Sequence, residues 1–180
     1  MITSAPFMSS REIKDLAETV VDSLKFAADG GRLSGKLSLA SLPRLFDVLT
    51  SREGRLDCEL SGARIERAGG EVQSVLNLKV AGRMGLRCQR CLAEVSFDCM
   101  IDTRLLLVPE GVEWPADEMD SDDYDALPAA KALSVRELVE EEVLLALPIA
   151  PRHADCLPPG RMEQGSGPSP FAALAQLKKH

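Results

Sequence analysis

The sequence predicts an α+β domain, in which an antiparallel β-sheet from about residue 33 to residue 108 carries helices packed on one face. Two observations predict this class. Polar and apolar residues alternate along several segments in the first two thirds of the chain, which is the period of half-buried strands. Residues 134–147 then repeat their apolar side chains at helical spacing. The connections between the predicted strands are short, which favours antiparallel neighbours.

Composition divides the chain into three parts. We expect a helical or weakly ordered N-terminal segment, residues 1–30, a core domain, residues 31–156, and a tail, residues 157–180, which is a Pro/Gly-rich linker with a short helix. A length of 180 residues with 45% hydrophobic content suits one core. No run of 18 apolar residues and no basic patch followed by an apolar stretch occurs, so we expect no membrane span, no secretory signal and a cytoplasmic protein.

The predicted elements follow from local patterns. In residues 1–30 apolar side chains recur at helical spacing: Ile13, Leu16, Val20 and Leu24. A first strand is marked by Leu33, Leu37 and Leu39, and a short helix follows with Pro43 in its first turn, where the missing N–H does no harm. Further strands are predicted at residues 55–62, 72–80, 82–88 and 95–108.

The last third begins with an acidic, irregular loop at residues 109–133. A helix follows at residues 134–147, because Ser134 and Glu137 form a capping box and Pro148 ends the pattern. In the tail, a short helix after Pro170 would place apolar side chains on one side: Phe171, Leu174 and Leu177. Such a short helix is not stable alone in water, so we predict that it binds a partner or docks on its own core.

The net charge of −7 is unevenly placed. Residues 1–110 are neutral, whereas the stretch from Glu110 to Asp125 holds only acids among its charged residues. A protein that binds the phosphate backbone of nucleic acid non-specifically needs a positively charged surface. Any contact with nucleic acid would therefore use a local patch or pass through another protein.

Two short pairs of residues carry the strongest chemical signal: Cys88 with Cys91, and His153 with Cys156. Each pair places two donors at a spacing that tetrahedral Zn²⁺ accepts, and together they supply three sulfurs and one imidazole. Reduced thiols without metal and a redox pair are the alternatives. The redox reading is weaker, because the first pair lies in a turn between predicted strands and not at the start of a helix.

A glutamate, a group of arginines and two further cysteines each allow a structural interpretation, and the first two also allow a functional one. On the 134–147 helix, Glu140 falls on the solvated side, whereas Glu142 falls within the apolar stripe. There Glu142 would orient His153 or pair with an arginine; alternatively it forms an ordinary ion pair, or the helix is rotated enough to expose it. Arginines gather near the cysteine turn and could contact RNA phosphate or nearby acids: Arg83, Arg87 and Arg90. Cys58 and Cys99 lie on apolar strand faces and are predicted to pack in the core.

Four stretches together resemble one family. They are residues 88–92 (CQRCL), residues 137–148 (ELVEEEVLLALP), Pro151-Arg152-His153 with Cys156, and residues 170–178 (PFAALAQLK). From about residue 35 to its end, the chain resembles the YceD family of bacterial large-subunit ribosomal RNA accumulation proteins. The resemblance implies a role in synthesis, processing or stability of that RNA, and less directly metal and nucleic-acid binding.

We therefore predict a non-catalytic ribosome-biogenesis factor with a structural zinc site. Its expected partners are large-subunit ribosomal RNA or a pre-ribosomal particle, together with ribosomal or assembly proteins, and neither a membrane nor a small-molecule substrate is expected. Motifs of phosphate-binding loops, zinc proteases and serine hydrolases are absent from the sequence. The alternatives are a thiol-redox or cysteine-dependent enzyme that uses Cys88 and Cys91, and an adaptor that binds only proteins.

Overall fold

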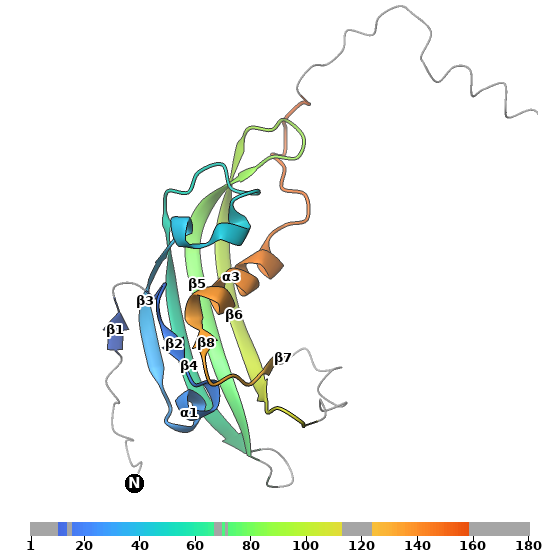
Figure 1. Cartoon of the computed structure of the whole chain (residues 1–180). Coiled ribbons are helices and arrows are strands. Elements are labelled where there is room, and N and C mark those ends of the chain that lie inside the picture. Colours follow the sequence, from blue (N-terminus) through green and yellow to red (C-terminus); the bar gives the residue numbers. More distant parts are fainter. Residues whose placement is uncertain (1–10, 14–15, 67–69, 71, 113–123, 159–180) are drawn as a thin grey trace, which may run out of the picture.

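The computed structural model describes residues 11–13, 16–66, 70, 72–112 and 124–158. A curved sheet of long strands forms the body of the protein, and the helices lie over it (Figure 1). The elements are β1 (Arg11–Ile13), β2 (Val20–Val21), α1 (Ser23–Ala28), β3 (Arg32–Ser38), the 3₁₀ turns η1 (Leu39–Ser41) and η2 (Pro43–Leu45), β4 (Arg55–Glu66), β5 (Val72–Arg87), β6 (Glu94–Val108), β7 (Asp125–Pro128), β8 (Leu133–Ser134) and α3 (Val135–Ala146).

The main sheet has six strands in the order β1-β3-β4-β5-β6-β7, and β2 pairs with β8 in a separate ribbon. Its four central strands are antiparallel to one another, whereas β1 and β7 join the two edges in parallel. The predicted α+β class is confirmed, and the sheet is mixed. The three-part division of the chain stays a prediction, and most of the tail lies outside the described residues.

The sheet has one apolar and one charged face. The register places Leu60 opposite Leu78, and Leu78 opposite Thr103, on the apolar side. Four side chains of α3 belong to the same buried cluster as the inward residues of β3 to β6: Val135, Leu138, Val139 and Val143. The other face carries cross-strand ion pairs: Lys36–Asp57, Lys79–Asp102 and Arg83–Asp98. Charges on one face only are typical of a sheet with one solvated side.

The N-terminal segment differs from the prediction. In its described residues, 11–13 and 16–30, the helix is confined to α1, and short strands, β1 and β2, occupy positions where helical spacing predicted a helix. Pairing with β3 and β8 therefore overrides the local pattern. The short helix after Ser41 is a pair of 3₁₀ turns, and the expected loop at 109–133 contains β7.

One continuous strand, β5, replaces the two predicted at residues 72–80 and 82–88. The glycine between them, Gly82, does not interrupt the strand. A Cβ atom there would lie 2.6 Å from the Leu56 side chain and 3.0 Å from the Arg55 carbonyl. Glycine is therefore required because the neighbouring strand approaches closely.

The predicted helix at 134–147 is confirmed as α3, and the Ser134 hydroxyl accepts a hydrogen bond from the Glu137 N–H. The prediction was wrong about which glutamate is buried. Glu140, assigned to the solvated side, is 1% exposed, whereas Glu142 is half-buried. Glu140 Oε1 accepts a hydrogen bond of 2.7 Å from the Arg44 N–H in η2, and Arg136 lies 3.7 Å away. The demand of that backbone donor for an acceptor explains why a carboxylate is buried here.

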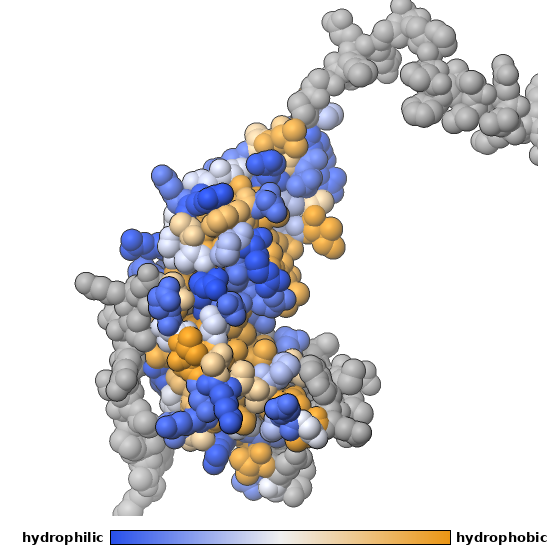
Figure 2. Space-filling model, viewed as in Figure 1, coloured by the Kyte–Doolittle hydropathy of each residue, from blue (hydrophilic) through white to orange (hydrophobic). Residues whose placement is uncertain are grey.

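Burial of Glu142 raises its pKa, and the negative charges of Asp125 and Glu141 act in the same direction. Seen from the side of Figure 1, hydrophilic and hydrophobic residues are interspersed over the surface, and hydrophobic groups lie near both ends and along one flank (Figure 2). No helix in the described part of the chain is long and apolar enough to cross a membrane.

Replacing Glu140 by alanine is expected to lower the free energy of unfolding by about 1–3 kcal/mol, because the Arg44 N–H loses its acceptor inside the protein. The matched variant is Glu141→Ala, which removes an exposed ion pair with Arg44 and should cost less than about 1 kcal/mol. Urea unfolding of both variants measures the difference. Equal losses would show that the Glu140 contact contributes no more than a surface pair.

Candidate metal centre

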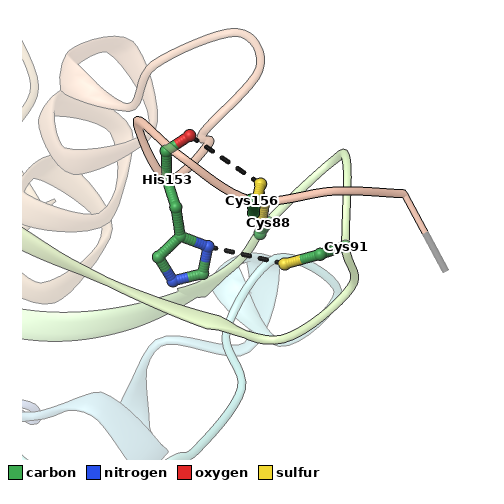
Figure 3. A group of neighbouring side chains, drawn as sticks. All are labelled: Cys88, Cys91, His153 and Cys156. Carbon is green, nitrogen blue, oxygen red and sulfur yellow. Dashed lines mark hydrogen bonds between the residues drawn. The ribbon is translucent and has the colours of Figure 1, made fainter.

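Four side chains from two segments that are distant in sequence meet at the end of the sheet that carries the β5–β6 turn (Figure 3). Cys88 and Cys91 lie in the turn that joins β5 to β6, and His153 and Cys156 follow α3. One ligand atom from each residue can be chosen so that all four lie within 4.8 Å of one another. We call these four residues the Cys3His cluster. The predicted convergence of the two pairs is therefore found in the fold.

Backbone hydrogen bonds position the first pair. The Cys88 N–H donates to the Ala93 carbonyl, and the Leu92 N–H donates to the Cys88 carbonyl, so the turn closes on itself. Leu92 has a φ of 65°, a conformation that costs a leucine about 1 kcal/mol or more. Leu92 directly follows Cys91, and its left-handed conformation lets the chain turn back from the two cysteines into β6.

The second pair is held against this turn by contacts outside the cluster. The Gln89 N–H donates to the Pro151 carbonyl at 2.8 Å. Arg90 donates from its guanidinium to the Cys156 carbonyl at 2.9 Å. The segment with His153 and Cys156, which is separated from Cys91 by 61 intervening residues, is thereby fixed beside the cysteine turn.

The distances fit one tetrahedral ion better than a disulfide. Sγ of Cys88 and Sγ of Cys156 are 3.5 Å apart, and Sγ of Cys91 lies 3.5 Å from Nδ1 of His153. Two sulfurs bound to one zinc ion at about 2.3 Å each would be separated by about 3.8 Å. A disulfide requires about 2.05 Å between sulfurs, and all five cysteines are free.

The histidine is oriented as a metal ligand would be. Its Nε2 lies 2.7 Å from the Glu94 carbonyl, and only a protonated Nε2 can donate there. The lone pair is then left on Nδ1, which faces the thiols (Figure 3). Histidine ligands usually donate their second ring N–H to a carbonyl or carboxylate in this way. The donor set, its spacing and its outer contacts therefore fit a metal ion.

The thiols differ in acidity. Burial raises the pKa of Cys88, but backbone hydrogen bonds at Cys91, Arg90 and His153 and the Cys156 thiol outweigh it and lower the pKa to about 5. One of these bonds runs from the Arg90 N–H to the Cys88 sulfur at 3.4 Å. The pKa of Cys156 is raised by burial and by its hydrogen bonds and charge repulsion with Cys88 and Cys91. A thiolate at Cys88 is thus favoured before any metal binds.

The two remaining cysteines lie in the core, as predicted. Cys58 is 2% exposed and Cys99 is fully buried. Burial raises the pKa of both thiols, that of Cys58 to about 12. They pack as small apolar residues among the strands.

The predicted arginines take three different roles. Arg83 is paired with Asp98 at 2.6 Å. Arg90 is bound to the Cys156 carbonyl. Arg87 is exposed and, within the described part of the chain, forms no ion pair. The structure thus places Arg90 in the cysteine turn and Arg87 at the end of β5 directly before it, whereas Arg83 lies further back along β5; no described acid pairs with Arg87.

Sequence reasoning missed two residues that support the cluster, Glu94 and Thr50. Glu94 binds His153 through its carbonyl, and its carboxylate accepts a hydrogen bond from the Thr50 hydroxyl at 2.5 Å. Because this contact uses backbone, no residue type marks it in the sequence. The Glu94 carbonyl thus contacts the His153 ring, and the role of Glu142 stays a prediction. The residues predicted to bind a partner, Phe171, Leu174 and Leu177, lie outside the described residues.

A family model described as "Large ribosomal RNA subunit accumulation protein YceD" matches residues 76–178. This range begins in β5, includes the whole Cys3His cluster and covers more than half of the chain. No curated protein and no solved structure matches the chain.

In metal-free protein we expect one thiol to ionise near pH 5, because backbone donors stabilise the Cys88 thiolate. Titration followed by the ultraviolet absorbance of thiolate measures this step, and Cys88→Ser should abolish it. Since the ordinary pKa of a cysteine is 9.0, this group stabilises the fold more as pH rises from about 5 to about 9, and the contribution is lost as pH falls through 5. A first thiol ionisation at pH 8 or above would contradict the assignment; Cys58→Ala is the control.

Proposed function

The chain belongs to the YceD family, and we propose that it acts in the accumulation of the large ribosomal RNA subunit as a non-catalytic ribosome-biogenesis factor of the cytoplasm. The observation that carries this proposal is the family match, which includes the Cys3His cluster. The role covers synthesis, processing or stability of large-subunit ribosomal RNA. Its partners are that RNA or a pre-ribosomal particle, with no small-molecule substrate.

Zinc is the metal that we assign to the Cys3His cluster. Three sulfurs and one imidazole fill a tetrahedral coordination sphere, so no ligand position remains for water or substrate, and the site is structural. The ion would join the β5–β6 turn to the segment after α3 and contribute to folding free energy. The cluster residues would bind the ion and hold the two segments in place, and none of them is assigned a catalytic step.

Two surfaces are proposed to meet the ribosomal particle. Among the described residues, α1 and α3 pack on the apolar face of the sheet, and the charged face keeps its side chains exposed. At its cluster end, Arg83, Arg87 and Arg90 contact RNA phosphate, and Arg87 contributes most because its charge is not paired within the described residues. The acidic loop at 109–133 engages basic ribosomal proteins, and the tail binds an assembly partner through Phe171, Leu174 and Leu177.

A thiol-redox function is the second candidate, and two observations favour it. Cys88 has a low pKa, and its sulfur is 3.5 Å from that of Cys156. Against it, the Cys88–Cys91 pair lies in a turn between strands, without the helix N-terminus that activates many redox cysteines. Alkylation separates the two functions: slow reaction that speeds up after chelation supports the zinc site, and rapid reaction at one thiol supports redox chemistry.

Deleting the gene is expected to lower large-subunit ribosomal RNA relative to small-subunit RNA. The wild-type gene and a Cys58→Ala control should restore the ratio, whereas a Cys88→Ser/Cys91→Ser variant should not, because the metal ligands are lost. RNA electrophoresis measures the ratio, with immunoblots to confirm equal protein levels. An unchanged ratio in the deletion strain under every growth condition would refute the proposed role.

Binding of large-subunit RNA is expected to weaken steeply with salt if the arginines contact phosphate. Replacing Arg87 and Arg90 by alanine should reduce the slope of log affinity against log salt by about 2, one unit for each phosphate contact. The matched control removes Arg32 and Arg64, which lie elsewhere on the sheet and should matter little. No measurable RNA binding by the wild-type protein would favour an adaptor that binds only proteins.

A further inference from the structure

Within the described part of the chain, the outer edge of β6 is open over most of its length. β7 pairs with β6 only at Leu105–Val108. From Val95 to Arg104, no strand among the described residues lies on this side of β6. A long strand edge of this kind presents unpaired N–H and C=O groups and is a template for another chain.

The backbone groups at this edge can be identified. β5 and β6 keep one continuous register from Val75–Leu106 to Arg87–Glu94, so the direction of the carbonyls alternates without a bulge. The Glu94 carbonyl points outward to His153, and the Val108 carbonyl points outward to the Ala129 N–H. Even-numbered residues therefore direct their backbone groups away from β5. Five of them are exposed and lie along the open edge: Ser96, Asp98, Met100, Asp102 and Arg104.

Apolar side chains near this edge are incompletely covered. Val95, Phe97 and Ile101 face the core but remain half-buried. α3 packs against β6, and in Figure 1 its C-terminal turn extends past that strand, away from β5. Leu145 in this turn is 72% exposed, and Ile149 just beyond it is fully exposed. An additional layer of protein at the edge would cover these residues.

We propose that the edge pairs with β6 of a second copy of this chain, antiparallel and with the two-fold axis at Cys99. In this register Phe97 lies opposite Ile101 of the other copy, an aromatic residue opposite a β-branched one on the core side. On the charged face, Glu94 lies opposite Arg104, and Ser96 lies opposite Asp102. No pair of like charges is directly opposed. This inference goes beyond the proposed function and does not depend on it.

Neighbouring registers fit less well. Moving the axis to Met100 places Asp98 opposite Asp102, and moving it to Asp98 places that carboxylate opposite itself; like charges in such positions are destabilising. Moving the axis to Ile101 shortens the pairing to Asp98–Arg104, because Leu105, which would lie opposite Phe97, is already paired with β7. With the axis at Cys99, the pairing uses the full open edge, from the contact of Glu94 with His153 to the start of β7.

The dimer joins two sheets into one, and its charged faces become a continuous surface. Glu94, which contacts the cluster, is five residues from the axis, so at about 3.4 Å per residue the two Cys3His clusters lie about 35 Å apart. A symmetric pair of clusters facing opposite ends would then present two equivalent contact sites.

Sedimentation equilibrium of the full-length protein over a range of concentrations tests the proposal. We expect a species of twice the chain mass of 19.5 kDa. Ser96 offers a matched pair of variants, because it is exposed and faces Asp102 of the other copy. Ser96→Lys should tighten the dimer, and Ser96→Glu should weaken it, each by about three- to tenfold in the dissociation constant, since each change acts twice across the axis.

A second variant tests the edge itself. Met100→Pro removes one outward N–H without touching the β5 ladder, and it should shift the protein toward monomer; circular dichroism checks that the fold is kept. A monomer at every concentration would overturn the proposal and leave the edge to another partner. A dimer that is insensitive to both Ser96 variants would overturn it as well, because the interface would lie elsewhere.

Discussion

The structure depends on one long-range contact, the docking of the segment after α3 onto the turn between β5 and β6. Without it, Cys88 and Cys91 are an ordinary turn at the end of a hairpin, and His153 and Cys156 lie in a chain that follows a helix. The Gln89–Pro151 and His153–Glu94 hydrogen bonds bring the two segments together. These bonds hold the donors at a spacing that suits one ion and fix the histidine tautomer that leaves Nδ1 free to bind it. A metal ion would therefore find its site largely formed, which reduces the ordering cost of binding.

The rest of the fold supports this contact from the side of the sheet. β5 and β6 are long and share a continuous register, so their turn is carried at the end of a stiff hairpin. The side chain of Glu94, whose carbonyl binds the histidine, is fixed by Thr50; a Cβ atom on Gly85 would lie 2.5 Å from both partners, so only glycine leaves room for them. On the other side, buried Glu140 ties α3 to η2 through Arg44. The segment that leaves α3 toward His153 thus starts from a helix whose position is set by the core.

The sequence was informative where a local pattern carries the structure, and less so where distant contacts decide it. Alternation predicted the central strands, and a capping box predicted α3 with the correct start. The spacing of the two pairs predicted the Cys3His cluster, because zinc chemistry restricts the ligand types that occur together. Helical spacing could not show which side of α3 would receive the Arg44 N–H. The sequence therefore placed Glu142, and not Glu140, on the buried side of the helix. Nor could it reveal β1 and β7, whose strand conformation comes from pairing with β3 and β6.

The central claim is that the four donors hold a single structural zinc ion. Native mass spectrometry of protein purified without an affinity tag or chelator, combined with elemental analysis, tests it most directly. The account predicts one zinc per chain, lost in Cys88→Ser and in His153→Ala and retained in Cys58→Ala. Metal-free protein that stays folded and takes up no zinc when it is added, or zinc that remains after both ligand substitutions, would contradict the account.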